Sequence, residues 1–288
     1  MLLNYLQRKL RNCRHSALVL LFFLTGNSIV FGQLDSLKKA LINPGNAVHE
    51  VDLLNEIAYH FLRYAKPIQL DSAAHYIDQA YKKSMELQYL RGQTWSQFHR
   101  AYLFQHLDSL EVAASNLMAI APIFDALQDY KGMSYTYAKL YVLYRNPPIL
   151  DLHRSNFFAN RCVELYQSIP GINPYICYTA LYYLGLNHLH LDQVDSSNFY
   201  LKKAIDLNDK LKQYWTFAEV ALAYNYERQE QFSEAIKILE PLLSDQKQQD
   251  DASTAMWASH QIASLFVNLE DYPNSILFWE KAIEFARR

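Results

Sequence analysis

From about residue 50 onward, apolar residues recur with the three- and four-residue spacing of amphipathic helices. Three blocks show the pattern most clearly, over residues 181–207, 219–243 and 260–285. Each block has one apolar stripe, then a short loop rich in Asp, Gln and Glu, then a second stripe. The pattern therefore predicts a series of helix pairs, and no alternating pattern of the kind that strands produce accompanies it.

A small residue followed seven positions later by a second core residue recurs at intervals of 40, 42, 42, 38 and 40 residues. The small residues are Ala73, Ala113, Ser155, Ser197, Ala235 and Ser275, and their partners are Ala80, Ile120, Cys162, Ala204, Leu242 and Ala282. In the last three units another small residue stands twelve positions earlier, at Gly185, Ala223 and Ala263. Since antiparallel helices approach closely only where the facing residues are small, the spacing predicts stacked helix pairs.

These positions resemble tetratricopeptide repeats (TPRs), which place a small residue at position 8 and Ala at positions 20 and 27. Gly185, Ser197 and Ala204 match that spacing, as do the corresponding residues of the next two blocks. The resemblance implies an all-α, right-handed α-solenoid of about six TPR-like helix pairs over residues 51–288, with a period near 40 rather than the usual 34. The alternative is an ordinary helical bundle, which would have to reproduce the spacing three times by chance.

Residues 1–32 have the composition of a secretory signal peptide. Four basic residues and no acid precede an apolar run at residues 17–24, which is shorter than the roughly 20 residues that a membrane-spanning helix needs. We expect cleavage after Gly32, with an uncleaved N-terminal anchor as the alternative. Residues 33–50 are then an N-terminal linker or short helix, and we expect the mature chain not to span a membrane.

Charge and composition exclude several classes of function. Removing the four basic residues of the signal leaves 23 basic and 29 acidic residues, a net charge of −6, which argues against a nucleic-acid partner. The 7 glycines form no dinucleotide-binding or phosphate-binding loop. His188 and His190 would point about 200° apart on a helix and so cannot share a metal ion. We therefore expect no metal, no cofactor and no enzymatic activity.

Two cysteines, Cys162 and Cys177, remain after the signal. They could pair in an oxidising compartment, although Cys162 falls at a position where helices are expected to pack. The sequence leaves both alternatives open.

Aromatic residues are the one clear excess, with 22 Tyr, 15 Phe and 4 Trp. The repeat register places a row of mostly aromatic residues on the concave side of the first helices: Trp95, Phe98, Tyr102, Tyr135, Tyr182, Leu186, Phe217, Tyr224, Trp257 and His260. Such a row suits a groove that binds an extended peptide or a helix. Longer helices that need more aromatic packing are the alternative explanation.

The signal peptide and the long-period repeats together resemble the periplasmic repeat region of bacterial TPR-containing sensor histidine kinases and regulators. That resemblance implies an exported interaction module, in the periplasm or cell envelope of a Gram-negative bacterium, which binds a protein or peptide partner and takes part in signal transduction. A self-contained periplasmic assembly scaffold and a glycan-binding helical-repeat protein are the alternatives. Because the last repeat carries apolar residues on its outer side, end-to-end contact through this uncapped C-terminal repeat is a further expectation.

Overall fold

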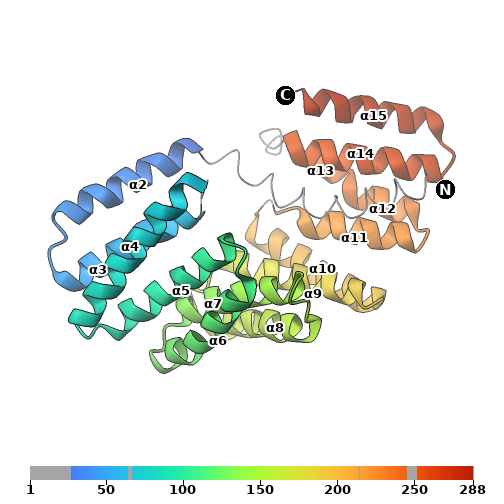
Figure 1. Cartoon of the computed structure of the whole chain (residues 1–288). Coiled ribbons are helices and arrows are strands. Elements are labelled where there is room, and N and C mark those ends of the chain that lie inside the picture. The colour runs from blue at the N-terminus through green and yellow to red at the C-terminus, as the bar shows by residue number, and fades with distance from the viewer. Residues whose placement is uncertain (1–26, 64–66, 214, 245–251, 288) are drawn as a thin grey trace. The chain divides into compact units, whose positions relative to one another are not determined.

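The computed structural model describes residues 27–63, 67–213, 215–244 and 252–287, and every regular element within them is a helix. The chain divides into two compact units, residues 1–116 and residues 117–288 (Figure 1). Most of the predicted signal segment lies outside the described residues, and α2 begins at Asn27. Cleavage after Gly32 and the boundaries at residues 32 and 50 remain predictions.

Unit 1 consists of antiparallel helices that pack in chain order. They are α2 (Asn27–Ile42), α3 (Ala47–Arg63), α4 (Pro67–Glu86), α5 (Leu90–His106) and the start of α6 (Leu110–Ala126). Helix α4 packs against both α3 and α5, and α3 also contacts α5 directly. Ala58, Leu62, Ala73 and Ile77 form a buried cluster between α3 and α4, so the small residue predicted at position 73 lies at a helix contact.

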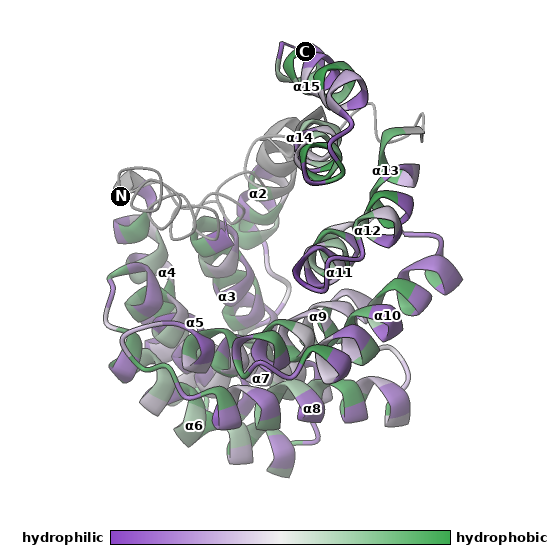
Figure 2. Cartoon of the chain, turned by 90° about the vertical axis from the view of Figure 1, so that its right-hand side faces the viewer, coloured by the Kyte–Doolittle hydropathy of each residue, from purple (hydrophilic) through white to green (hydrophobic). Residues whose placement is uncertain are grey.

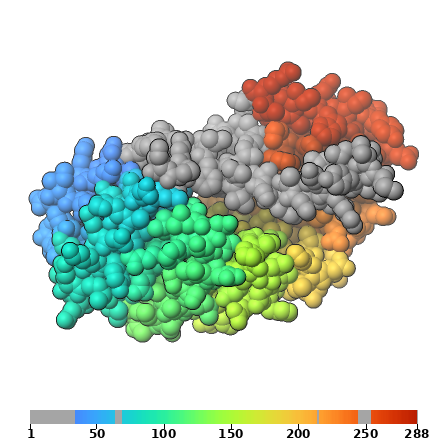
Figure 3. Space-filling model, in the orientation of Figure 1, coloured from blue at the N-terminus to red at the C-terminus, as the bar shows by residue number. Residues whose placement is uncertain are grey.

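Unit 2 also consists of helices that pack in chain order. Its helices after α6 are α7 (Tyr130–Arg145), α8 (Leu152–Ser168), α9 (Pro174–His190), α10 (Val194–Leu211), α11 (Phe217–Arg228), α12 (Phe232–Leu239), α13 (Pro241–Ser244), α14 (Ala252–Asn268) and α15 (Tyr272–Ala286). From α7 to α12 each helix packs against the next, and α14 pairs with α15. In the space-filling view the colours of this unit follow chain order, as expected for a linear stack (Figure 3).

The first helices of the pairs, α7, α9 and α11, form one side of unit 2. We call this side the inner face. Helix α7 contacts α9, and α9 contacts α11, whereas no comparable contact joins α8 and α10. Helices that touch their equivalents in the next pair lie on the inside of the curvature of a stack. Hydrophobic and hydrophilic residues are interspersed along the helices (Figure 2), as expected for amphipathic helices with one side buried.

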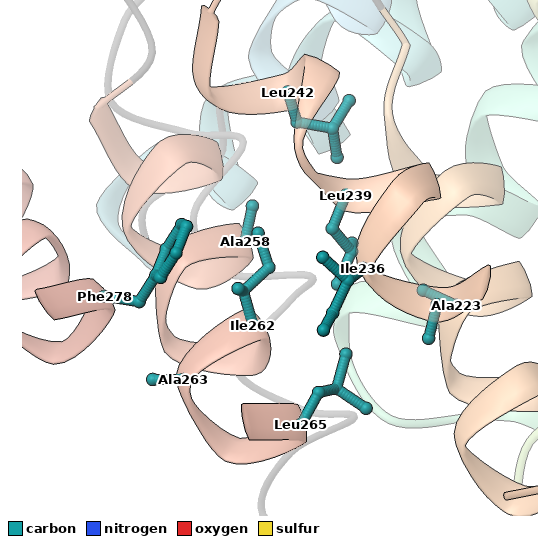
Figure 4. Packing of buried hydrophobic residues seen from close by; sticks show 10 residues of the cluster. Ala223, Ile236, Leu239, Leu242, Ala258, Ile262, Ala263, Leu265 and Phe278 are labelled. Carbon is teal, nitrogen blue, oxygen red and sulfur yellow. The ribbon is translucent and has the colours of Figure 1, made fainter. Parts of the chain in front are cut away.

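The predicted small-residue contacts are confirmed. All of the residues of the repeat spacing are buried, from Ala73 and Ala80 to Ser275 and Ala282. A Cβ added to Gly185 would lie 2.6 Å from Leu201 Cγ, so α9 and α10 meet at that glycine. Figure 4 shows Ala223 and Ala263 in the cluster that joins α11, α12, α14 and α15.

Six loops between consecutive helices share one turn that uses no glycine. The second residue after the helix has a left-handed backbone each time: Gln88, Asp108, Gln128, Asp192, Glu230 and Glu270, with φ between 53° and 60°. The N–H of the following residue donates to a carbonyl five residues back, as Asp129 N does to Phe124 O at 2.9 Å. Such turns usually place glycine at this position. Glycine is therefore missing from these six loops even at the left-handed position that favours it.

No helix within the described ranges has both the length and the apolar composition to cross a membrane.

Some of the helices begin with a side-chain cap. The capping residue accepts a hydrogen bond from a backbone N–H of the helix that follows it, and these residues include Asp129, Asp151, Asn173 and Asp271.

Candidate functional site

A band of aromatic rings crosses the inner face of unit 2. It consists of Tyr175, Tyr178, Tyr182 and Tyr183 on α9, Trp215 before α11, and Phe217 at the start of α11, and we call it the aromatic band. Ring centroids lie 5.4 Å apart for Tyr182 and Tyr183, 5.8 Å for Tyr182 and Phe217, and 5.1 Å for Tyr175 and Trp215. These separations are those of favourable aromatic pairs, so ring contacts join α9 to Trp215 and to the start of α11 in the next repeat.

The sequence of α9 explains why the tyrosines gather on one side. Tyr175, Tyr178 and Tyr182 are spaced three and four residues apart, which aligns them along a helix. Pro174 and the cap by Asn173, whose Oδ1 accepts from Tyr175 N at 2.9 Å, fix the start of that helix. The position of the first ring in the band is therefore set by a rigid helix start.

The Tyr178 hydroxyl and Asn208 hold the connection between α10 and α11. The hydroxyl of Tyr178 donates to Trp215 O and accepts from Ala218 N, both at 3.0 Å. Asn208 Oδ1 accepts from Trp215 N at 3.1 Å. Because Thr216, the residue before α11, makes no side-chain cap, Tyr178 satisfies an N–H that the helix itself cannot. Trp215 is thus held in place although it lies in a loop.

Arg145, the last residue of α7, lies beside the band. Its Cζ is 5.7 Å from the centre of the Tyr183 ring, and Tyr183 in turn contacts Tyr141 at 5.2 Å. The side chain is half-buried and its Nε is buried without a hydrogen-bond partner. Burial lowers the pKa of Arg145, because it disfavours the charged form.

Two further ionisable groups on the helices of the inner face are shifted by burial. Burial lowers the pKa of Lys139, on α7, to about 7. It also raises the pKa of Glu219, on α11, to about 7, against the opposing effect of a hydrogen bond that Asn208 Nδ2 donates to Glu219 Oε1 at 3.4 Å. Both shifts mark a poorly hydrated region, since burial disfavours the charged form of either group.

Three of the predicted site residues come together in this region. Tyr182, Leu186 and Phe217 are half-buried and pack against one buried cluster that includes Tyr178 and Leu201. Tyr135, on α7, and Tyr224, on α11, are also half-buried. Sequence reasoning missed the other members of the band and the arginine beside it: Tyr175, Tyr178, Tyr183, Trp215 and Arg145.

The predicted residues of unit 1 form a separate group on α5. Trp95 is half-buried and meets Phe98 edge-on at 5.4 Å. Phe98 itself is fully buried, so its assignment to a ligand-binding surface is wrong. The Phe98 side chain points from α5 into the core of unit 1. Tyr102 is half-buried and packs against the cluster of Ala58 and Leu62, which agrees with the packing alternative at this position.

The last two predicted residues, Trp257 and His260, lie on α14. They are half-buried, with ring centroids 5.8 Å apart, and His260 also meets Trp279 of α15 at 4.6 Å. Whether the predicted residues bind a ligand stays a prediction.

A second set of polar residues, also missed from the sequence, lies between repeats. Asn187 Nδ2 donates to Ser155 Oγ and Asn156 Oδ1, both at 2.8 Å. One repeat later, Asn225 Nδ2 donates to Ser197 Oγ and Asn198 Oδ1, also at 2.8 Å. We call these two sets the asparagine rungs. A signal existed in the sequence, because each Asn stands two residues after the small residue of its helix.

Other candidate ligands have structural roles. His188 stacks on Tyr200 with ring centroids 5.2 Å apart, and its Nδ1 lies 2.7 Å from Gln193 Oε1. Cys162 and Cys177 are buried free thiols. Within the described ranges, no group of three or more His, Cys, Asp or Glu residues is arranged to hold a metal ion.

The outer side of α15 is an exposed apolar stripe. Tyr272, Ile276, Trp279 and Ile283 are 59%, 59%, 39% and 51% exposed. Trp279 stands at the position of Leu201 and Leu239, which are fully buried in earlier repeats. On this side of α15 the described residues place no further helix of the stack.

No protein-family model matches the chain, and no curated protein matches it. Solved structures do resemble it. The signal transduction ATPase with a TPR sensor from Pyrococcus horikoshii has a TM-score of 0.68 and 11% identity, over 88% of this chain and 39% of that protein. The chain is a solenoid of TPR-like helix pairs.

Two Rap proteins resemble nearly the whole TPR-like chain. Apo RapI has a TM-score of 0.55 and 14% identity, over 92% of this chain and 96% of its own. A plasmid-encoded Rap regulator of conjugation, solved with a Phr peptide, has a TM-score of 0.53 and 11% identity, over 90% of this chain and 75% of its own. At these identities the likeness concerns the fold alone.

Proposed function

We propose that this protein is an exported, non-enzymatic interaction module that binds a peptide or protein segment across the aromatic band. The observation that carries the proposal is the continuous ring contact from Tyr183 through Tyr182 to Phe217, which joins α9 to α11, the first helix of the next pair. Half-buried Tyr, Phe and Trp provide a large contact area at a low entropic cost, and their polar tips can hydrogen-bond a backbone.

The bound Phr peptide of one Rap structure supports the same use of the fold, since a peptide is the ligand there. Export and a part in envelope signalling rest on residues 1–32 and on the resemblance to sensor proteins. They belong to the proposal and need their own test. Fractionation of a Gram-negative host that expresses the full chain should place it in the periplasm, with Gln33 as the first residue. A full-length product in the cytoplasm would contradict export.

Peptide selection tests the binding function. The full chain is used to select binders from a library of random twelve-residue peptides, and the affinities of selected peptides are measured for the wild type and for Phe217→Ala. We expect the variant to weaken binding about tenfold or more, because truncation of a central aromatic anchor costs over 1 kcal/mol.

Phe199→Ala is the matched control, since Phe199 is an exposed phenylalanine on α10, outside the band. Its peptide affinities should equal those of the wild type. Selection of no peptide by the wild type would contradict the proposal. Equal loss in both variants would show that the aromatic band is not the binding surface.

We also propose that the exposed stripe of α15 makes end-to-end contact with a second copy of this chain. The stripe has the four-three-four spacing of a coiled-coil seam over residues 272, 276, 279 and 283. Antiparallel pairing of the stripe with its copy would place Ile276 opposite Trp279, and Tyr272 opposite Ile283, of the second copy. It would also align the helix dipoles favourably.

A further inference from the structure

The charged residue beside the aromatic band differs from other arginines of the chain. Arg100 lies 5.1 Å from the centre of the Tyr81 ring and is paired with Asp78, N to O, at 2.7 Å. Arg154 lies 5.4 Å from the centre of the Tyr144 ring and is paired with Asp151 at 3.5 Å.

Arg145 makes the same kind of ring contact, with Tyr183, but no carboxylate of the described residues pairs with it. Its electrostatic neighbours are the tyrosines Tyr182 and Tyr183. Its guanidinium is thus both partly dehydrated and uncompensated.

An uncompensated, half-buried cation is costly to fold, and a counter-ion removes much of that cost. Guanidinium groups bind carboxylates through two parallel hydrogen bonds, which are stronger in a dehydrated site than in water. The ring of Tyr183 holds one side of the group, and this leaves its edge as the surface that a ligand can reach.

We propose that Arg145 binds a carboxylate of the peptide that lies across the aromatic band. The inference rests on the proposed peptide binding and names the chemistry that the site selects. The carboxylate comes either from an Asp or Glu side chain or from the C-terminus of the peptide. The two sources present the same group, and the experiment separates them.

Two peptide arrays of identical random composition are probed with the full chain, one with amidated and one with free C-termini. We expect Asp or Glu to be enriched at one position among binders in the amidated array, if a side chain is bound. Preference for the free-acid array without such enrichment would assign the site to a peptide C-terminus. Either result supports the proposal.

The variant Arg145→Gln then tests the residue. Its affinity for the selected acidic peptides should fall about 10- to 100-fold, since a hydrogen bond to a charged group contributes about 1.5–3 kcal/mol. Arg145→Lys keeps the charge but loses the paired donors, so its affinity for these peptides should lie between those of the wild type and Arg145→Gln. Arg154→Gln is the control, because that arginine already has its own carboxylate, and it should bind as the wild type does.

A coupling measurement keeps the test valid if Arg145→Gln is poorly folded. Changing the Asp or Glu of the peptide to Asn or Gln (or amidating the C-terminus, if that is the source) should weaken binding to the wild type by the same factor, with no change in the protein. The same peptide change should have little effect on Arg145→Gln.

Each failure has a distinct signature. Peptide binding with no preference for a carboxylate in either array would overturn the role of Arg145 and leave the proposed function intact. Absence of all peptide binding would overturn the proposed function itself.

Discussion

At the residue scale, the buried polar groups of unit 2 are of two kinds. Some side chains have hydrogen-bond partners outside their own helix and so join neighbouring elements: Tyr178, Asn187, Asn208 and Asn225. The Nε of Arg145 and the Oε2 of Glu219 are buried without a hydrogen-bond partner. The first kind stabilises the fold, and the second kind costs stability.

We predict that Glu219→Gln removes a pH dependence of stability. The pKa of Glu219 is about 7 in the folded chain against 4.5 for an unperturbed carboxyl. The native state therefore holds the proton more tightly, and stability falls as the pH rises from about 4.5 to 7. Above that window the ionised wild type should be less stable than the variant, by at most about 3 kcal/mol.

Urea unfolding at pH 5 and at pH 8 measures this difference. The wild type should lose more stability than the variant between the two values. Equal loss in both proteins would show that Glu219 titrates normally. Asp195→Asn, at an exposed carboxylate of α10, is the control and should behave as the wild type does.

We predict that Tyr178→Phe loosens the start of α11. The change removes the hydroxyl that bonds Trp215 O and Ala218 N and leaves both backbone groups without that partner, which should cost about 1–3 kcal/mol. Hydrogen exchange of the Ala218 amide should become faster, while Tyr272→Phe, at an exposed tyrosine, should have no effect. Unchanged exchange would contradict the capping role.

The sequence could predict only part of the site at this scale. Tyr182, Leu186 and Phe217 were found because they stand at regular positions of well-defined repeats. Phe98 was misplaced because the early repeats match the pattern poorly, so the side that it faces was assigned incorrectly. Trp215 lies in a loop, where helical periodicity gives no direction. Arg145 ends a helix before an inserted loop, and no spacing rule marks it.

At the element scale, the helices and their contacts follow from short-range patterns. The small residues at Gly185, Ala223 and Ala263 were predictable because close helix approach restricts side-chain size at fixed intervals. The left-handed turns were not, because their usual mark is glycine and here Gln, Asp or Glu occupies the position. Local hydrogen bonds, rather than residue type, hold these turns.

We predict that Gln128→Gly stabilises the chain. Gln128 is exposed and has φ 54°, a conformation that costs an L-residue about 1–2 kcal/mol and costs glycine little. Part of that gain is lost to the greater freedom of glycine in the unfolded state, so a net gain of about 0.5–1 kcal/mol is expected.

Gln128→Ala is the matched control, because it removes the same polar side chain and keeps the Cβ. The thermal unfolding midpoint should rise for the Gly variant alone. A rise in both variants would attribute the effect to the side chain rather than to the backbone.

At the scale of the whole molecule, the fold class was predictable because a repeat reports the same pattern several times. The likeness of nearly the whole chain to RapI agrees with that prediction, at 14% identity. The function stays a prediction, since the repeat spacing fixes the fold and names no partner. The division into two units had no mark in the sequence.

We predict that Ile276→Glu abolishes self-association. Sedimentation of the full chain should show a dimer at micromolar concentration, and the charge placed in the middle of the α15 stripe should give a monomer. Phe157→Glu, at an exposed apolar residue of α8, should remain dimeric. A monomeric wild type would contradict the proposed contact between copies.

The asparagine rungs also bear on how such a chain can grow. Asn187 and Asn225 each donate from Nδ2 to a Ser hydroxyl and to the side-chain oxygen of the Asn that follows it. Residues 174–213 are therefore a 40-residue segment that begins with the donor helix of one rung and ends with the acceptor helix of the next. If a second copy of the segment were inserted after residue 213, Asn187 of the inserted copy would donate to Ser197 and Asn198 of the original copy. Asn225 would then donate to Ser197 and Asn198 of the inserted copy. Tandem duplication of this segment would therefore lengthen the protein with the Nδ2 donor paired at every rung.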